Sequence, residues 1–492
     1  MALFLLAISL LLAGAGASRP LDPNPSTTIL DVASSLHLAH SVLFFDPSSL
    51  STQQEKYAAA AFFPNSTGAE ISLEIRPRDA ILNSGHRDYA ALIQSRLSRD
   101  EARVSSLHAR HQLALSGASV SDLRPQENQE LLHPEEALVS APLTSGMSQG
   151  SGEYFARIGV GTPAKPMYMV VDTGSDVTWL QCKPCSDCYS QSNPVFDPAT
   201  SSSYSPLPCS SSQCSSLDSS SCRSGSCLYQ VNYGDGSFTF GDFATDVISL
   251  STSAAPKIAL GCGHDNEGLF VGAAGLVGLG GGPLSLTSQL KANSFSYCLV
   301  NRDSQSSSTL DFNAGPAPTG GAWGPLVRSS KIKTFFYVAL QGMSVGGHGL
   351  DIPASAFQID ESSGDGGVIV DCGTAVTRLR DQAYASLRDA FVSMTGHLRR
   401  KQAGVALFDT CYDLAGMSSV SVPTLAFQFA GGRSWSLPAM NYLIPVDNSG
   451  TYCLAFAPTS SSLSIIGNVQ QQGTRVAFDL ANNRVSFSPN QC

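Results

Sequence analysis

Charged residues are scarce in this chain of 492 residues, of which 14% are Asp, Glu, Lys or Arg, whereas globular proteins average about a quarter. The 29 lysines and arginines form no long cluster, and the formal net charge is −10. Nucleic-acid binding depends on concentrated positive charge and is therefore not expected. Hydrophobic residues make up 42% of the chain, which is enough apolar surface to exclude an intrinsically disordered protein.

Long hydrophobic runs are also missing, since none reaches the roughly 18 residues that a membrane-spanning helix needs. Residues 2–12 are apolar, and the small residues Ala15-Gly16-Ala17 follow them, as at a signal-peptide cleavage site. We interpret residues 1–17 as a signal peptide; an N-terminal anchor is the alternative. The C-terminus carries neither a hydrophobic tail nor an ER-retention signal. We therefore expect a secretory-pathway protein without a membrane anchor, in the extracellular space or apoplast, with the ER or vacuole as other destinations.

Cysteine is absent before residue 182, and seven of the 13 cysteines then fall between Cys182 and Cys227. In an oxidising compartment such a cluster indicates disulfides, and the odd total leaves one cysteine over. A zinc site in the sequence CKPCSDC (182–188) is the weaker alternative, because no histidine lies among these cysteines. No metal and no cofactor are expected.

The stretch before the cysteines, residues 18–135, differs in texture from the rest and contains little Gly-rich turn sequence. Within residues 86–115 apolar side chains recur at helical spacing, at Ala91, Ile93, Leu97, Val104 and Leu107. Five arginines share this predicted helix: Arg87, Arg96, Arg99, Arg103 and Arg110. The stretch is either a small helical domain or a propeptide whose arginines cover an acidic site. Its Asn65 lies in the only N-glycosylation sequon.

From about residue 136 onward the chain consists of short Val, Ile, Phe and Tyr runs bounded by Gly, Pro, Asn and Asp, which is typical of strands. Asn482-Asn483 predicts a hairpin turn. One helix is predicted at 381–395, with Asp381 as its cap. So many short strands indicate a sandwich, a barrel or a two-lobed β protein.

An internal repeat carries the chemistry. The segment Met169–Ser175 (MVVDTGS) recurs as Val368–Thr374 (VIVDCGT), so that Asp172 corresponds to Asp371. Each copy is followed downstream by a hydrophobic pair and a Gly, at 275–278 and at 465–467. Two similar lobes, each presenting one Asp from a tight turn, would bring two carboxylates together across a pseudo-two-fold axis.

Such a carboxylate pair has a specific chemistry. Two carboxylates about 3 Å apart cannot both ionise readily, so they share one proton. One then acts as general base on a water while the other protonates a peptide carbonyl. Gly174 and Gly373 would let each backbone turn and approach closely. The hydroxyls of Ser175 and Thr374 would donate to the outer carboxylate oxygens.

These residues resemble the pepsin-like aspartic endopeptidases, and more closely their nepenthesin-like plant group, with the guard-cell-type proteases nearest. The likeness covers about residues 145–492, where GEYFARIGVGTP, DTGSDVTWLQC, YGDGS, GLVGLG and SIIGNVQQQGTRVAFD stand in family order. It implies an all-β, bilobal fold with a central cleft, preceded by a partly helical propeptide at 18–135. The N-terminal lobe would span 136–325, with a cysteine-rich insert at 182–227, and the C-terminal lobe 326–492.

The resemblance also implies roles for individual residues. Asp172 and Asp371 match the catalytic pair, supported by Thr173, Gly174, Ser175, Cys372, Gly373 and Thr374. Tyr233 matches the tyrosine of a flap over the substrate, with Gly234, Asp235, Gly236 and Ser237. Trp179 matches a residue that hydrogen-bonds this tyrosine. From the residues alone, Asp235-Gly236 predicts a hairpin tip, whereas Tyr233 and Trp179 could equally be ordinary strand and core aromatics.

The cysteines follow the group as well. The implied disulfides are Cys182–Cys185, Cys188–Cys262, Cys209–Cys227, Cys214–Cys222, Cys298–Cys492 and Cys411–Cys453. This pairing leaves Cys372, where relatives have Ser or Thr. A thiol is a weaker hydrogen-bond donor than a hydroxyl, so Cys372 is either a tolerated substitution or a cause of weakened catalysis.

The sequence thus predicts a secreted, monomeric aspartic endopeptidase that is made as a zymogen and cleaves proteins at acid pH. The basic helix would lie in the acidic cleft as an intramolecular inhibitor, and acid would weaken that attraction. The main alternative is a catalytically weak or inactive pepsin-fold protein that binds and inhibits glycosidases; a structural or storage protein is a second. The survival of both Asp motifs favours the enzyme.

Overall fold

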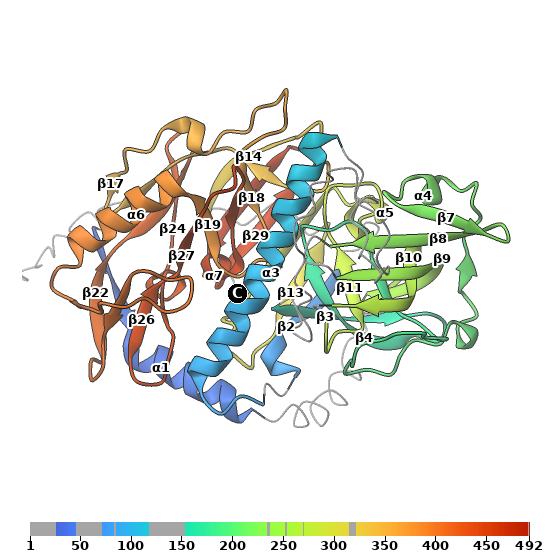
Figure 1. The fold of residues 1–492 in the computed structure, drawn as a ribbon, viewed down its shortest axis with the longest axis horizontal. Helices are drawn as coiled ribbons and strands as arrows, with labels where there is room; N and C mark the ends of the chain where they lie inside the picture. Colours follow the sequence, from blue (N-terminus) through green and yellow to red (C-terminus); the bar gives the residue numbers. More distant parts are fainter. Residues whose placement is uncertain are drawn as a thin grey trace, which may run out of the picture.

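The structure is a computed structural model that describes residues 26–45, 71–82, 85–117, 153–233, 237–250, 253–268, 270–313, 321–490 and 492. The expected signal peptide, Asn65, and the flap residues Gly234, Asp235 and Gly236 lie outside these ranges. Two bodies rich in strands lie side by side, and the long helix α3 (Tyr89–Ser116) runs across the boundary between them (Figure 1). The predicted two-lobed β architecture is confirmed.

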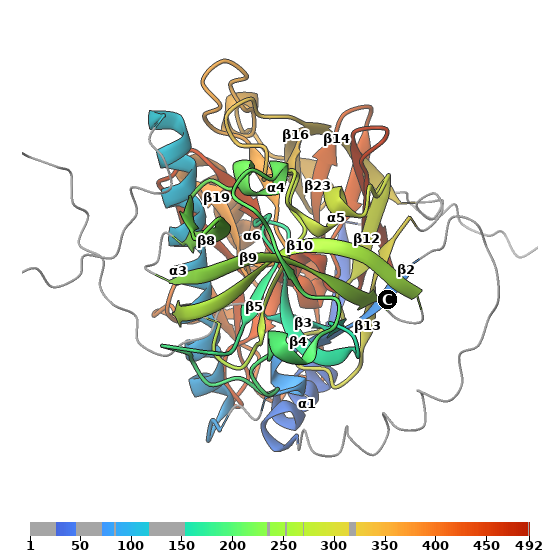
Figure 2. The ribbon, with the colours of Figure 1, turned by 90° about the vertical axis from the view of Figure 1, so that its right-hand side faces the viewer.

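The N-terminal lobe is organised around β9 (Phe238–Leu250), which pairs with β8 (Ser226–Asn232) on one side and β10 (Ser253–Glu267) on the other. These three strands lie beside one another in Figure 2. The remaining elements of this lobe are β3 (Tyr154–Val160), β4 (Lys165–Asp172), β5 (Trp179–Gln181), β6 (Ser205–Pro206), β7 (Ser220–Arg223), β11 (Gly275–Gly278), α4 (Ser212–Ser215), α5 (Leu286–Gln289) and the 3-10 turn η4 (Pro198–Thr200).

The C-terminal lobe contains two four-stranded sheets, in the orders β17-β16-β23-β24 and β20-β21-β26-β25, together with a parallel core. Its elements are β15 (Tyr337–Val338), β16 (Leu340–Val345), β17 (His348–Gly349), β18 (Val368–Val370), β19 (Thr377–Arg380), β20 (Arg399–Arg400), β21 (Cys411–Asp413), β22 (Ser419–Pro423), β23 (Leu425–Phe429), β24 (Arg433–Ser436), β25 (Leu443–Pro445), β26 (Thr451–Leu454), β27 (Phe456–Thr459), β28 (Ser464–Ile466), α6 (Asp381–Met394), α7 (Asn468–Gln471), η5 (Ala354–Ala356) and η6 (Ala439–Asn441).

A sheet built from distant parts of the chain connects the lobes. It runs β2-β13-β12-β29-β30-β14, and β2 also pairs with β3 of the N-terminal lobe. The strands are β2 (Ile71–Pro77), β12 (Ser294–Cys298), β13 (Ser308–Phe312), β14 (Ala322–Val327), β29 (Thr474–Asp479) and β30 (Arg484–Pro489). Phe295 and Phe478 stack at its centre, with ring centroids 4.6 Å apart. The two lobes therefore share part of one core.

The internal repeat appears as two equivalent pairs of parallel strands. β4 ends at Asp172 beside β11, with Asp172 opposite Gly278, and β18 lies beside β28, with Val370 opposite Ile466. Gly278 and Gly467 are required by close approach, because a Cβ there would lie 2.2 Å from the Asp176 carbonyl oxygen and 2.5 Å from that of Ala375. Each lobe thus delivers one Asp at the end of a buried strand.

The N-terminal segment, defined here as the described residues within 26–117, contributes strands that pair with strands of both lobes. β1 (Thr27–Asp31) pairs with β22 of the C-terminal lobe, and β2 enters the connecting sheet. α1 (Val32–Ser41), η1 (Val42–Phe44) and η2 (Arg78–Ala80) complete the segment with α3. Because both strands pair with the lobes, this segment does not form a separate helical domain.

The predicted helix at 86–115 is found as α3. The Asp88 side chain caps its start by accepting the Ala91 N–H at 2.8 Å, and Gly117, with φ 71°, ends it. Ile93, Leu97, Val104 and Leu107 are buried as predicted, whereas Ala91 is exposed. Each fully buried apolar side chain stabilises the docked helix by roughly 1.5–3 kcal/mol.

Two further sequence predictions can be compared directly. The helix predicted at 381–395 is α6, but Asp381 lies in its first turn and makes no side-chain cap, so that detail was wrong. Tyr384, Leu387 and Phe391 are buried on α6. The hairpin predicted at Asn482-Asn483 joins β29 to β30, and Asn483 adopts φ 49°.

Four of the expected disulfides differ in the structure. Cys182 bonds Cys262, because β5 lies parallel to β10 and brings their Cα atoms within 5.3 Å. Cys185 bonds Cys188 across a short loop. Cys209 bonds Cys222 and Cys214 bonds Cys227, whereas the expected pairs were Cys209–Cys227 and Cys214–Cys222. Cys222 and Cys227 face each other across β7 and β8, and each bonds one cysteine of the 209–214 stretch. Cys298–Cys492 and Cys411–Cys453 are found as expected.

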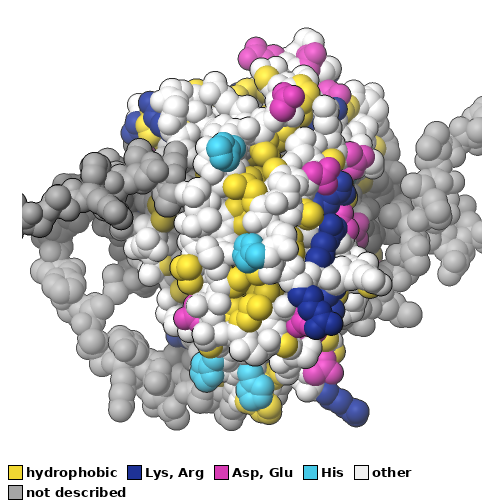
Figure 3. Space-filling model, turned by 90° about the vertical axis from the view of Figure 1, so that its left-hand side faces the viewer, with side chains coloured by type: hydrophobic (Ala, Val, Ile, Leu, Met, Phe, Trp, Pro, Cys, Tyr) yellow, Lys and Arg dark blue, Asp and Glu magenta, His cyan; other side chains and the backbone are white. Residues whose placement is uncertain are grey.

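The cysteines of the 182–188 stretch are all disulfide-bonded, so none is available there as a zinc ligand. Within the described part of the chain, no helix combines the length and the hydropathy of a membrane crossing. On the face of the C-terminal lobe shown in Figure 3, basic side chains are interspersed with acidic ones and form no continuous basic surface.

Disulfide mapping tests this arrangement. A non-reduced digest analysed by mass spectrometry should yield a Cys182–Cys262 linkage and a separate Cys185–Cys188 loop, with Cys372 as the thiol that alkylates after unfolding. Recovery of Cys182–Cys185 and Cys188–Cys262 would instead restore the pairing implied by the family resemblance.

Candidate active site

The two repeated aspartates meet on a single nitrogen atom. Nη2 of Arg103, from the N-terminal segment, lies 2.5 Å from Oδ1 of Asp172 and 3.3 Å from Oδ2 of Asp371. Both carboxylates are buried, with 1% of each side chain exposed. A Cβ on Gly373 would lie 2.7 Å from Oδ1 of Asp172, so the glycines that follow the aspartates permit this approach. The predicted pair is therefore assembled around one guanidinium.

Each carboxylate is also held by its own turn. Asp172 accepts hydrogen bonds from the Gly174 N–H at 2.9 Å and from the Ser175 hydroxyl. Asp371 accepts from the Thr374 N–H at 2.9 Å and from the Thr374 hydroxyl at 2.7 Å. The two hydroxyl residues thus make equivalent contacts to the outer oxygens, in the geometry the sequence predicts.

Thr173 and Cys372 form hydrogen bonds from one lobe to the other, next to the aspartate pair. The Thr173 hydroxyl accepts the Cys372 N–H at 3.0 Å and lies within reach of Asp371 Oδ1 at 3.1 Å and the Val370 carbonyl at 3.5 Å. Cys372 Sγ faces the Val171 carbonyl in return, at 3.6 Å. The Cys372 thiol has the Thr173 hydroxyl and the Val171 carbonyl as its hydrogen-bond partners, so the weaker donor lies on the link between the lobes.

Burial and neighbouring charges shift the pKa values of the two carboxyl groups in opposite directions. Burial raises the pKa of Asp172; the Arg103 charge opposes this, and the neighbouring Asp371 raises it further. Burial also opposes ionisation of Asp371, but Arg103 and the Thr374 and Thr173 hydroxyls outweigh it and lower its pKa. Because the two carboxyl groups are this close, their two titrations belong to the pair and not to either residue.

Tyr233 and Ser237 are the described residues of the expected flap. Tyr233 follows β8, and its hydroxyl accepts a hydrogen bond from Trp179 Nε1 at 2.9 Å. Phe270 packs against both rings, with centroids 4.9 Å from Tyr233 and 5.0 Å from Trp179. The Tyr233 N–H donates to the Ser237 carbonyl at 2.8 Å, which closes the base of the loop. Phe270 was not identified from the sequence, since no motif marks it.

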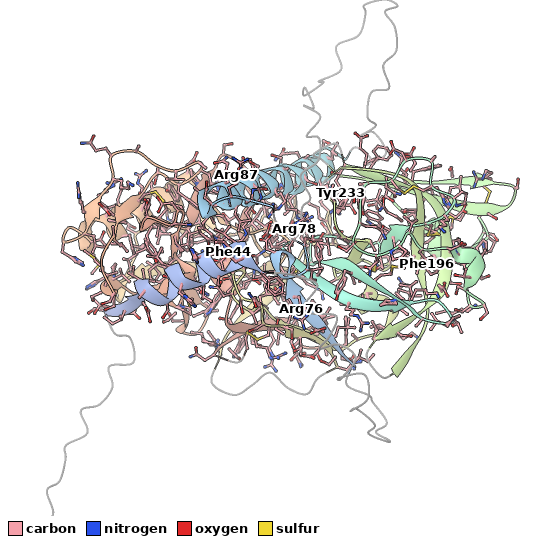
Figure 4. All side chains as sticks on the ribbon, turned by 90° about the horizontal axis from the view of Figure 1, so that it is seen from below. Phe44, Arg76, Arg78, Arg87, Phe196 and Tyr233 are labelled. Atoms are coloured by element: carbon pink, nitrogen blue, oxygen red, sulfur yellow. A yellow bond between two sulfur atoms is a disulfide. The ribbon has the colours of Figure 1, made fainter. Side chains whose placement is uncertain are left out.

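A hollow is lined by Tyr233 and by residues of α3 and the Asp172 turn, and Figure 4 shows the labelled Tyr233 near one end of the α3 ribbon. Its lining includes Arg110, Ser175, Asp176, Leu217 and Asp218. Arg110 donates to the Gly174 carbonyl at 2.6 Å and lies over the Phe335 ring. This hollow is therefore the region beside the Asp172 turn that α3 leaves open.

Other charged residues of the N-terminal segment are buried against the N-terminal lobe. Arg96 contacts Asp79 and Asp303, each at 2.6 Å. Arg99 contacts Glu153 at 2.9 Å. The sequence predicted five arginines on one helix without distinguishing them. The structure shows that Arg103 is the arginine that contacts both Asp172 and Asp371.

Comparison with known proteins agrees with this geometry. Residues 154–312 match the family described as "Xylanase inhibitor N-terminal", and residues 335–489 match "Xylanase inhibitor C-terminal". The chain is 46% identical to Protein ASPARTIC PROTEASE IN GUARD CELL 2 of Arabidopsis thaliana, over 87% of this chain and 89% of that protein. It is 39% identical to aspartic proteinase nepenthesin-1 of Nepenthes gracilis, over 80% of this chain and 92% of that protein.

The chain belongs to the plant aspartic proteases. Because these relatives are named aspartic proteases, the chain is an aspartic-type endopeptidase. The crystal structure of edgp superimposes with a TM-score of 0.58 over 68% of this chain and 91% of that one, at 21% identity. At that identity the likeness shows the fold alone, which is the pepsin-like bilobal fold predicted from the sequence.

The chemistry of Cys372 provides a test of the site. The thiol is 2% exposed, and burial together with the two neighbouring carboxylates raises its pKa, so it stays protonated and unreactive. The native protein should resist thiol reagents for hours and react after unfolding in urea, as followed by mass. Cys372→Ser should change proteolytic activity by less than about threefold, since the thiol makes only weak hydrogen bonds. Rapid labelling of the native protein would contradict this account, as would a large loss of activity in Cys372→Ser.

Proposed function

We propose that this protein is a secretory-pathway zymogen, and that Asp172 and Asp371 activate one water to hydrolyse peptide bonds of proteins at acid pH. The observation that carries the proposal is the shared contact of both carboxylates with Nη2 of Arg103. An atom at that position touches both acids, which is the position that an attacking water requires. The chain's own helix occupies it in the precursor.

The reaction follows from one proton shared between two acids. The ionised carboxylate takes a proton from the water as its oxygen attacks the peptide carbon, while the protonated carboxyl gives its proton to the carbonyl oxygen. A tetrahedral gem-diol results. One gem-diol hydroxyl then returns its proton to a carboxylate, and the amide nitrogen gains a proton as the C–N bond breaks. The products are a carboxylic acid and an amine, and the pair is left with one proton again.

Neighbouring groups support this chemistry. Ser175 and Thr374 hold the outer oxygens, so that the inner oxygens face the water. Tyr233, fixed by Trp179, would lie over a bound peptide and exclude bulk water. Activity requires one ionised and one protonated acid, so it should fall both at very low pH and towards neutral pH.

Acid release of α3 follows from the titration of its contacts. Burial opposes ionisation of Asp79, but Arg96 and Arg99 outweigh it and lower its pKa, in the same direction as that of Asp371. A carboxylate with a lowered pKa contributes stability above its unfolded pKa and loses it as pH falls through the folded pKa. These contacts are therefore intact at neutral pH, begin to weaken near the ordinary aspartate pKa of about 4, and are lost only as the pH falls through the lowered pKa values of the folded protein.

The secretory route and the processing are part of the same proposal. Six disulfides support an oxidising compartment. Residues 1–17 have the composition of a signal peptide.

The family description as xylanase inhibitors supports a second candidate, a pepsin-fold protein that binds glycosidases without proteolysis. It is less well supported, because both aspartates keep their glycines and hydroxyl partners. Purified protein that inhibits a xylanase but digests no protein substrate would favour it.

The catalytic pair can be tested by proteolysis of casein or haemoglobin between pH 3 and pH 6. The full-length protein, after acid treatment, should digest these substrates in a pepstatin-sensitive manner. Asp172→Asn should lower the rate by roughly 10²–10⁴-fold, the usual contribution of general acid–base catalysis. Asp360→Asn changes an exposed carboxylate away from the pair and should have no effect. No cleavage by the processed wild-type protein would refute the enzyme.

The zymogen contact can be tested with Arg103→Gln. Removing one partner of a buried ion pair costs about 3–5 kcal/mol, so the precursor should melt at lower temperature at pH 7. It should also self-process at a higher pH than the wild type. Arg87→Gln, an exposed change on the same stretch, is the matched control and should behave as wild type. Equal processing of wild type and Arg103→Gln at every pH would argue against an inhibitory role of α3.

A further inference from the structure

A second buried guanidinium lies beside the active-site turn of the C-terminal lobe. Arg378, on β19, has a side chain 3% exposed, and its Nη2 lies 2.9 Å from Asp100 and 3.1 Å from Glu101. Both of these carboxylates belong to α3. Among the described residues, no carboxylate of either lobe comes within 4 Å of Arg378. Its charge is therefore balanced from the N-terminal segment alone.

The same site binds the Asp100 carboxylate through the backbone. Asp100 Oδ1 accepts the Ala375 N–H at 2.5 Å, and the Val376 N–H lies 3.3 Å from Oδ2. Arg378 is fixed in turn by a hydrogen bond from its Nη1 to the Val376 carbonyl at 2.9 Å. Two backbone donors and one guanidinium thus form a carboxylate site, and Ala375 directly follows the Asp371–Thr374 turn.

The position of Asp100 relates this site to the catalytic pair. Asp100 precedes Arg103 by three residues, which is a rise of about 4.5 Å along a helix. Successive residues of an extended peptide are about 3.3 Å apart. When a substrate lies over the two aspartates, one of the three side chains nearest to the scissile bond, on one side of that bond, would therefore lie at Arg378.

We infer that Arg378, with the Ala375 and Val376 amides, is a substrate subsite that selects an acidic side chain close to the scissile bond. This inference rests on the proposed function, since the site opens only when α3 leaves. Asp100 then stands in the precursor for the Asp or Glu of a substrate. Once α3 has left, the guanidinium of Arg378 and the Ala375 and Val376 amides lose the Asp100 carboxylate that they bind in the precursor. A substrate carboxylate restores the pair; an amide of the same shape does not.

The test uses full-length protein processed by acid, and matched peptides that carry Asp or Asn at each of three positions on either side of one cleavable bond. The assay is run at about pH 5, where a substrate Asp is ionised. At one position kcat/KM should be about tenfold higher for Asp than for Asn, as for a hydrogen-bonded charge pair. The other positions should show no such preference.

The variant Arg378→Gln should abolish this preference, so that kcat/KM becomes equal within about twofold for the Asp and Asn peptides at that position. It is made together with Asp100→Asn, so that the precursor carries no unpaired buried charge. Arg380→Gln, two residues along the same strand and bonded to the Ser355 carbonyl, is the matched control and should keep the preference. Should the double variant fail to fold, Arg378→Glu with Asp100→Arg retains an ion pair in the precursor. That pair of changes should turn the preference from Asp to Lys.

The outcomes separate the two ideas. Cleavage of the Asn peptides with no preference for Asp at any position overturns the subsite and leaves the protease standing. A preference that survives in both charge variants also overturns it. Processed protein that cleaves none of the peptides refutes the proposed function, and the subsite with it.

Discussion

Two acids at the bottom of a cleft constrain the rest of this fold. Each must be delivered by the end of a buried strand, so each lobe contains a parallel pair that ends in a turn, β4 with β11 and β18 with β28. The turns must approach within hydrogen-bonding distance of each other, which requires Gly174 and Gly373. The charge of the buried pair must also be balanced, and Arg103 of α3 does so in this structure.

The N-terminal segment imitates a substrate through charge rather than through extended backbone. A helix cannot make the strand-like hydrogen bonds of a bound peptide, so it relies on side chains that end in the right positions. Arg103 reaches the catalytic pair, and Asp100 reaches the amides beside it. The buried pairs of Arg96 and Arg99 add contacts on the N-terminal lobe. Under the proposed zymogen mechanism, the same charges that hold the helix at neutral pH would make it sensitive to acid.

The sequence predicted the parts of the structure that depend on local pattern. Asp172 and Asp371 stand out because strand, acid, glycine and hydroxyl occur within seven residues, twice. The helix α3 was predicted from the helical spacing of its apolar residues, whereas its Asp88 cap was not. The disulfides were mostly wrong in the cysteine-rich insert, because four cysteines close in sequence can pair in several ways and only the packing of β5, β7, β8 and β10 selects one. β1 and β2 were not predicted at all, since their partners lie hundreds of residues away. For the same reason, no pattern separates Arg103 from the other arginines of α3, or Arg378 from ordinary surface charge.

The strand β2 has a consequence for how the precursor matures. It lies between β3 and β13, with hydrogen-bonded neighbours on both edges, in the sheet that joins the two halves of the molecule. Cutting the chain behind α3 therefore does not by itself detach what lies upstream, because an interior strand would have to be peeled out of a sheet. Under the proposed zymogen mechanism, the first cut would give a nicked molecule of two non-covalently associated chains, and the two aspartates would become accessible only after the slower separation of these chains.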